Sequence, residues 1–165
     1  MKYNSLREYF YKLHNLLYGI MLAPLLAFVV LYWLMQSGNI QGALKQDESL
    51  HFLLLLALGS VVVMDWGISF FLFSRGVKAA RTLDSLGKKL DRYFSFTLLR
   101  FALVASGSLG LAVGFFLTEN QIFTILVIAS FALLLLCWPS PERVCNDLQL
   151  KGDERILVQY KKDKL

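Results

Sequence analysis

The sequence contains few of the residues from which metal, redox and catalytic sites are built. It has only two cysteines, Cys137 and Cys145, and two histidines, His14 and His51. No CxxC motif, serine–histidine–acid set or glycine-rich phosphate loop is present. We therefore expect no catalytic site, no metal site and no cofactor, and we expect that the protein is not an enzyme.

Charged residues are also scarce, at 18% of the chain, and they are unevenly placed. A soluble protein interleaves charge along its helices, whereas here the apolar residues form four long blocks. The blocks cover roughly residues 13–35, 50–73, 94–117 and 122–138. A helix of about 20 apolar residues crosses a bilayer core of about 30 Å. The pattern predicts an all-α fold, a four-helix transmembrane bundle over residues 1–139, followed by a tail over residues 140–165.

The basic residues alternate from one side of these spans to the other. Three precede the first span, one lies in the first loop, six lie between spans two and three, none lies in the last turn and six lie in the tail. Loops rich in lysine and arginine stay in the cytoplasm. The alternation predicts a multi-pass protein of the cell (inner) membrane with the N-terminus and the C-terminus both cytoplasmic.

The segment between spans two and three carries the largest basic cluster outside the tail. Its basic residues are Arg75, Lys78, Arg81, Lys88, Lys89 and Arg92. Apolar residues recur between them at helical spacing, which predicts that spans two and three extend into a cytoplasmic helical hairpin, with a candidate N-cap at Asp84-Ser85. The alternative is a basic amphipathic segment on anionic lipid headgroups. In either case this surface is expected to contact lipid or a partner.

The tail begins with a strong helix-start signal. Ser140 is a natural N-cap, Pro141 suits the first helical position and Glu142 suits the positive helix end. We expect a short cytoplasmic helix from here to about Leu150, with an apolar island at residues 156–158 that is either a docking element or a weakly ordered end.

Asp65 and Arg100 are the charges inside the apolar spans. A carboxylate at the centre of a span costs roughly 2.5–3.5 kcal/mol, so such groups are usually paired or functional. At 1.5 Å per residue, Asp65 lies about 13 Å and Arg100 about 9 Å from the cytoplasmic side. An antiparallel hairpin brings both to similar depth, which predicts an intramembrane ion pair. The pair either fixes helix register or has an ion- or proton-linked role. Alternatively, Arg100 reaches the interface while Asp65 is protonated.

Small residues recur every four positions along the third span. They are Ala102, Ser106, Gly110 and Gly114. Small residues let helices approach closely in lipid, which favours either packing within the chain or homodimerisation through this stripe.

Two stretches resemble a group of small, uncharacterised four-span bacterial membrane proteins. The first is residues 83–93 with residues 98–103, and the second is residues 139–143 with residues 147–150. The resemblance implies the same four-span architecture. It implies no activity, because the group has none assigned.

Two function classes follow from these observations. We expect a non-enzymatic scaffold or accessory subunit in the lipid bilayer, with anionic lipid headgroups, a membrane-protein partner or a homo-oligomer as partners. The alternative is a small oligomeric ion- or proton-linked transporter that uses Asp65 and Arg100. The basic loop has no interleaved aromatics for stacking on bases, so we expect no nucleic-acid binding.

Overall fold

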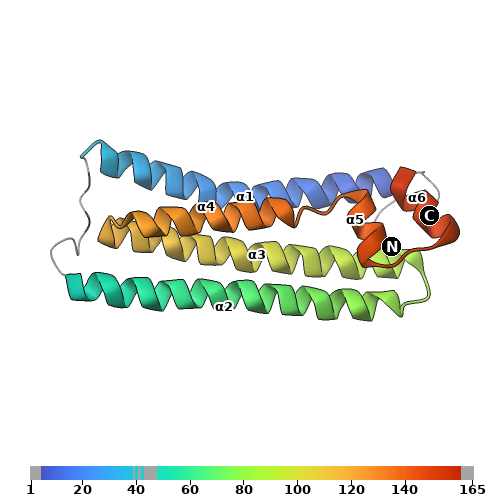
Figure 1. The fold of residues 1–165 in the computed structure, drawn as a ribbon. Helices are drawn as coiled ribbons and strands as arrows, with labels where there is room; N and C mark the ends of the chain where they lie inside the picture. Colours follow the sequence, from blue (N-terminus) through green and yellow to red (C-terminus); the bar gives the residue numbers. More distant parts are fainter. Residues whose placement is uncertain (1–4, 39, 41, 43–47, 161–165) are drawn as a thin grey trace. The chain divides into compact units, whose positions relative to one another are not determined.

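The structure is a computed structural model that describes residues 5–38, 40, 42 and 48–160, and this part of the chain is all-α (Figure 1). Its helices are α1 (Leu6–Gln36), α2 (Glu48–Arg81), α3 (Leu86–Thr118), α4 (Gln121–Leu136), α5 (Pro141–Asp147) and α6 (Gly152–Tyr160). Five of the basic residues counted above, Lys2, Lys45, Lys161, Lys162 and Lys164, lie outside the described residues.

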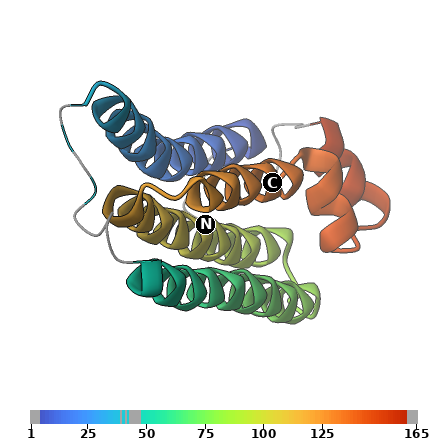
Figure 2. The ribbon, with the colours of Figure 1, turned by 60° about the vertical axis from the view of Figure 1, so that its left-hand side comes forward.

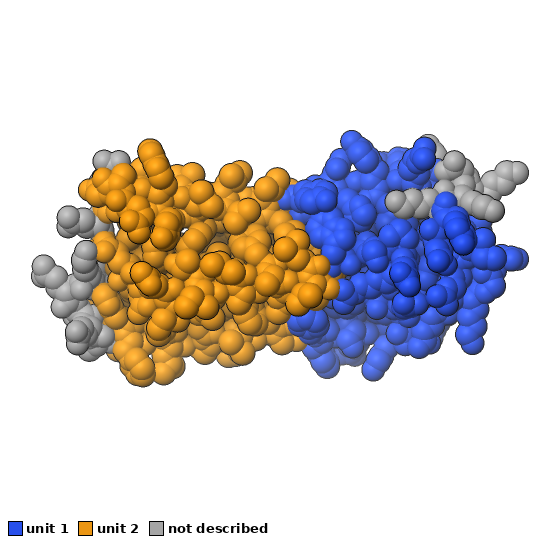
Figure 3. Space-filling model, turned by 45° about the horizontal axis from the view of Figure 1, so that its top comes forward, with its two compact units in different colours: residues 1–18, 69–100, 138–165 blue, residues 19–68, 101–137 orange. Residues whose placement is uncertain are grey.

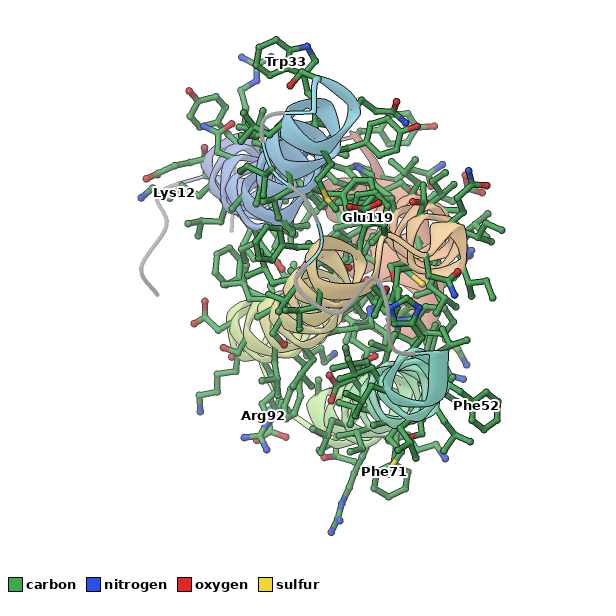
Figure 4. All side chains as sticks on the ribbon, turned by 90° about the vertical axis from the view of Figure 1, so that its left-hand side faces the viewer. Lys12, Trp33, Phe52, Phe71, Arg92 and Glu119 are labelled. Carbon is green, nitrogen blue, oxygen red and sulfur yellow. The ribbon has the colours of Figure 1, made fainter. Side chains whose placement is uncertain are left out.

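The first three helices are long and apolar enough to cross a membrane, by length and composition. Their large apolar side chains are widely exposed: Trp33 on α1 is 65% exposed, and Phe52 and Phe71 on α2 are 65% and 63% exposed. Figure 4 shows these three side chains projecting away from their helices. Many large apolar side chains exposed along long apolar helices fit a membrane protein better than a soluble monomer.

The fourth apolar block forms a shorter helix than the others. α4 has 16 residues, and it reaches the length of a span only together with α5, whose axis is bent from it by 80°. At 1.5 Å per residue, α4 alone is about 24 Å long, below the bilayer core of about 30 Å. The described chain therefore contains three candidate spans, or up to four if the bent pair is counted as one.

The chain divides into two compact units, coloured separately in Figure 3. Unit 1 comprises residues 1–18, 69–100 and 138–165, and unit 2 comprises residues 19–68 and 101–137.

Unit 2 is held by an apolar core contributed by four helices. The buried members of this core are Phe28, Val62, Leu111, Ala112, Phe115, Phe123 and Val127. Gly114 permits the closest approach, because a Cβ there would lie 2.6 Å from the Phe123 ring and 2.8 Å from Leu58. Also in unit 2, the Glu119 carboxylate accepts a hydrogen bond of 2.7 Å from the main-chain N–H of Gly42.

In unit 1 the end of α2 packs against the beginning of α3. The two helices are joined by residues 82–85, and Ser85 Oγ accepts a hydrogen bond from the Lys88 N–H at 3.4 Å, as expected of an N-cap. The rings of Phe73 and Tyr93 meet edge to face with centroids 5.6 Å apart. Gly76 has no side chain to hold the helices apart, and a Cβ at this position would collide with the Phe96 ring. Both helices extend beyond the apolar blocks 50–73 and 94–117.

The tail of unit 1 folds into α5 and α6, which lie against each other (Figure 2). α5 starts as predicted: Ser140 Oγ accepts from the Arg143 N–H, and Pro141 and Glu142 occupy the first turn. It ends three residues earlier than expected, because Gln149 has φ +54° and the Leu150 N–H turns back to bond the Cys145 carbonyl. This is the Schellman end of a helix.

Candidate functional site: a basic surface on unit 1

The predicted basic surface lies entirely in unit 1, on the facing ends of α2 and α3. Four of its six cations are exposed: Arg75, Lys78, Lys88 and Arg92. The other two, Arg81 and Lys89, are partly buried because they contact the tail. The surface therefore divides into cations that hold the fold together and cations that face outward.

Three side-chain contacts tie the tail to this surface. Arg81 Nε donates a hydrogen bond of 2.8 Å to the main-chain oxygen of Asp147, and the Tyr93 hydroxyl donates one of 3.0 Å to the Asp147 carboxylate. Lys89 Nζ lies 2.9 Å from a carboxylate oxygen of Glu154. The last two contacts neutralise or satisfy acids of α5 and α6, so the tail is attached to the hairpin by charge as well as by packing.

The tail also carries its own buried contacts. Val144, Leu148 and Val158 are at most 2% exposed, so the apolar island at residues 156–158 is part of the unit 1 core through Val158. The thiol of Cys145 faces the main-chain oxygen of Arg155 at 3.8 Å. Burial raises the pKa of the Cys145 thiol; the positive charge of Arg155 partly opposes this rise, and the negative charge of Glu142 adds a smaller increase.

A cavity opens on the basic surface between α2 and α3. It encloses about 280 Å³ and is lined by Leu72, Arg75, Gly76, Ala79, Arg92 and Phe96. The guanidinium carbon of Arg92 lies 5.4 Å from the centroid of the Phe96 ring, a cation–π distance. The cavity thus has an apolar floor and two cations at its rim.

The predicted ion-pair residues belong to different units. Arg100 is in unit 1, is 2% exposed, and its guanidinium carbon lies 3.9 Å from the centroid of the Phe73 ring. Asp65 is in unit 2, where a Cβ on Gly107 of α3 would lie 3.3 Å from its carboxylate oxygen. Each residue has a defined packing partner within its own unit, and the ion pair stays a prediction.

The predicted stripe of small residues has an uneven environment along α3. Ala102 and Ser106 are exposed, and Ser106 Oγ donates to the Leu103 carbonyl of its own helix at 2.7 Å. A Cβ on Gly110 would meet nothing within 4 Å, whereas Gly114 is enclosed by Phe123 and Leu58. Tight packing within unit 2 is therefore found at the Gly114 end of the stripe.

Sequence reasoning missed the residues that fix the tail, namely Tyr93, Asp147 and Glu154. Asp147 lies 54 residues from Tyr93 and 66 from Arg81, so no local spacing indicates these contacts. Gly76 was also missed, because a single glycine in a helix carries no signal until the Phe96 ring on the facing helix is seen. Among the described residues, no group of three or more histidine, cysteine or acidic side chains could hold a metal ion.

Comparison of the chain with protein-family models, with curated proteins and with solved structures finds no match.

Proposed function

We propose that this protein is a non-enzymatic integral membrane protein of the scaffold or accessory-subunit type. In this proposal it crosses the cell (inner) membrane four times, with both termini and the α2–α3 connection in the cytoplasm. Unit 1 then presents its basic hairpin and tail to a protein partner or to anionic lipid.

The observation that carries the proposal is the attachment of the tail to the hairpin. The contacts of Asp147 with Arg81 and Tyr93, and of Glu154 with Lys89, join α5 and α6 to α2 and α3 in one folded platform. Four further cations of this platform are left facing outward. A fixed array of exposed cations favours binding of an acidic surface, because the charges are already positioned before the partner arrives.

The charge distribution supports the proposed orientation. The α2–α3 end carries six basic residues, and the described part of the tail adds Arg143, Lys151 and Arg155. The residues between α3 and α4 carry no basic residue. This asymmetry is the one that places basic loops in the cytoplasm.

Photo-crosslinking in cells tests the proposal. A photoreactive amino acid replaces Lys78 or Lys88, which are exposed on unit 1, and in a control it replaces Leu53, which is 61% exposed on unit 2. We expect adducts with a discrete protein, or adducts enriched in anionic lipid, from the unit 1 positions. Leu53, which faces the bilayer hydrocarbon in this proposal, should give adducts with bulk lipid only. Protein adducts and anionic-lipid enrichment no greater from Lys78 and Lys88 than from Leu53 would contradict a binding platform on unit 1.

A further inference from the structure

We infer that the cavity between α2 and α3 in unit 1 binds one anionic phospholipid, with the headgroup phosphate between Arg75 and Arg92. This inference rests on the proposed function, because it needs unit 1 to lie beside a bilayer. It narrows the proposed contacts of the basic surface to one ligand class and one pair of residues.

The charge of the cavity rim favours an anionic ligand. Both arginines line the same cavity and both are exposed (Figure 4 labels Arg92). A guanidinium presents a planar fork of donors that matches the oxygens of a phosphate. Neither arginine has a carboxylate among the residues that line the cavity with it. The rim of the cavity is therefore complementary to an anion.

The apolar floor of the cavity favours a lipid, because a free anion would not contact it. Leu72 and Phe96 line the cavity together with the backbone of Gly76. Because Gly76 has no Cβ, the Phe96 ring lies directly on α2, and in this position it supports the Arg92 guanidinium at 5.4 Å. With the phosphate at the arginines, an acyl chain on the adjoining glycerol would continue along Leu72 and Phe96.

The position of the cavity along α2 and α3 also favours a lipid. Leu72 and Phe96 fall inside the apolar blocks 50–73 and 94–117, whereas Arg75 and Arg92 fall just outside them. The cavity therefore crosses the boundary at which hydrocarbon gives way to headgroups. Basic pockets between helices at this depth on the cytoplasmic side are the usual sites for anionic lipid headgroups.

The test is titration of the detergent-solubilised full-length protein with phosphatidylglycerol, followed by native mass spectrometry. The double variant Arg75→Gln/Arg92→Gln is compared with Lys78→Gln/Lys88→Gln, which removes the same charge from exposed cations that do not line the cavity. We expect the arginine variant to bind phosphatidylglycerol about tenfold more weakly than the parent protein. The lysine variant should bind it with an affinity close to that of the parent protein. Circular dichroism and melting of each variant confirm folding.

A second variant tests the shape of the cavity without changing its charge. Gly76→Ala displaces the Phe96 ring, so we expect weaker binding of phosphatidylglycerol with an unchanged response to phosphatidylcholine. Equal losses of phosphatidylglycerol affinity in the arginine and lysine variants would overturn the inference in favour of diffuse attraction. Competition by inorganic phosphate at concentrations equal to the lipid would also overturn it, because the site would then bind free phosphate. These outcomes leave the proposed function standing, because the crosslinking experiment detects a protein partner independently.

Discussion

The Tyr93 hydroxyl donates a hydrogen bond to the Asp147 carboxylate over 3.0 Å, and it does so across 54 residues of sequence. Tyr93 is fully buried and Asp147 is half-buried, so this bond joins the start of α3 to the end of α5 at a place with little water. The same aspartate receives Arg81 on its main-chain oxygen. Asp147 is therefore the point at which the tail meets both helices of the hairpin.

Replacing Tyr93 with Phe is expected to loosen the tail. The variant keeps the ring but leaves the Asp147 carboxylate without this donor, at a cost of about 1–3 kcal/mol. Trypsin cleavage after Lys151 and Arg155 should accelerate, since both residues lie in the part of the tail that is released. The control is Tyr160→Phe, because Tyr160 is 67% exposed. Equal cleavage rates in the two variants would show that the Tyr93 bond does not hold the tail.

Replacing glycine with alanine is expected to lower stability at Gly114 but not at Gly110. Gly114→Ala places a methyl group 2.6 Å from the Phe123 ring, and overpacking of this kind costs about 1–3 kcal/mol. Gly110→Ala meets nothing within 4 Å, so it should leave the melting temperature in detergent unchanged or slightly raised. Similar melting temperatures for the two variants would contradict the close approach at Gly114.

Alkylation of Cys145 is expected to depend on pH in a way that reports its burial. Only the thiolate reacts, and burial raises the pKa of this thiol. In a Cys137→Ser background, the alkylation rate should still be rising at pH values where an exposed thiol has levelled off. The reference is Lys151→Cys in a chain without either native cysteine. A Cys145 profile that levels off at the same pH as the reference would show that the thiol is not perturbed.

Asp65→Asn separates a structural role from proton transport. The proposed function assigns no ion flux to Asp65, so proteoliposomes with the variant should show the same proton flux as those with the parent protein. Loss of flux in the variant would favour the oligomeric transporter that uses Asp65 and Arg100. An Arg100→Gln variant, measured in parallel, shows whether any effect involves both charges.

The sequence predicted those parts of the fold that depend on local chemistry. Long apolar runs give α1, α2 and α3, and Ser140 with Pro141 gives the start of α5. Ser85 is the N-cap that the spacing indicated. The predicted end of α5 was three residues too late. The helix ends at a left-handed residue, which is usually glycine, and Gln149 in that position does not indicate a helix end in the sequence.

The contacts that build the candidate site could not be predicted in the same way. The pairing of Lys89 with Glu154 depends on how α6 returns to α3, which no helical periodicity encodes. The basic cluster itself was visible, but its division into tail-binding and outward-facing cations was not. The cavity needs Gly76 opposite Phe96, which is a relationship between two helices rather than a motif.

Cysteine accessibility in intact cells tests the central claim most directly, namely that the chain crosses the membrane with the basic hairpin in the cytoplasm. Single cysteines replace Ser37 and Lys88, both exposed, in a chain in which Cys137 and Cys145 are serine. We predict that a membrane-impermeant maleimide labels the Ser37→Cys protein in intact cells and the Lys88→Cys protein only after the membrane is opened. Labelling of Lys88→Cys in intact cells, or of both positions from the same side, would contradict the account.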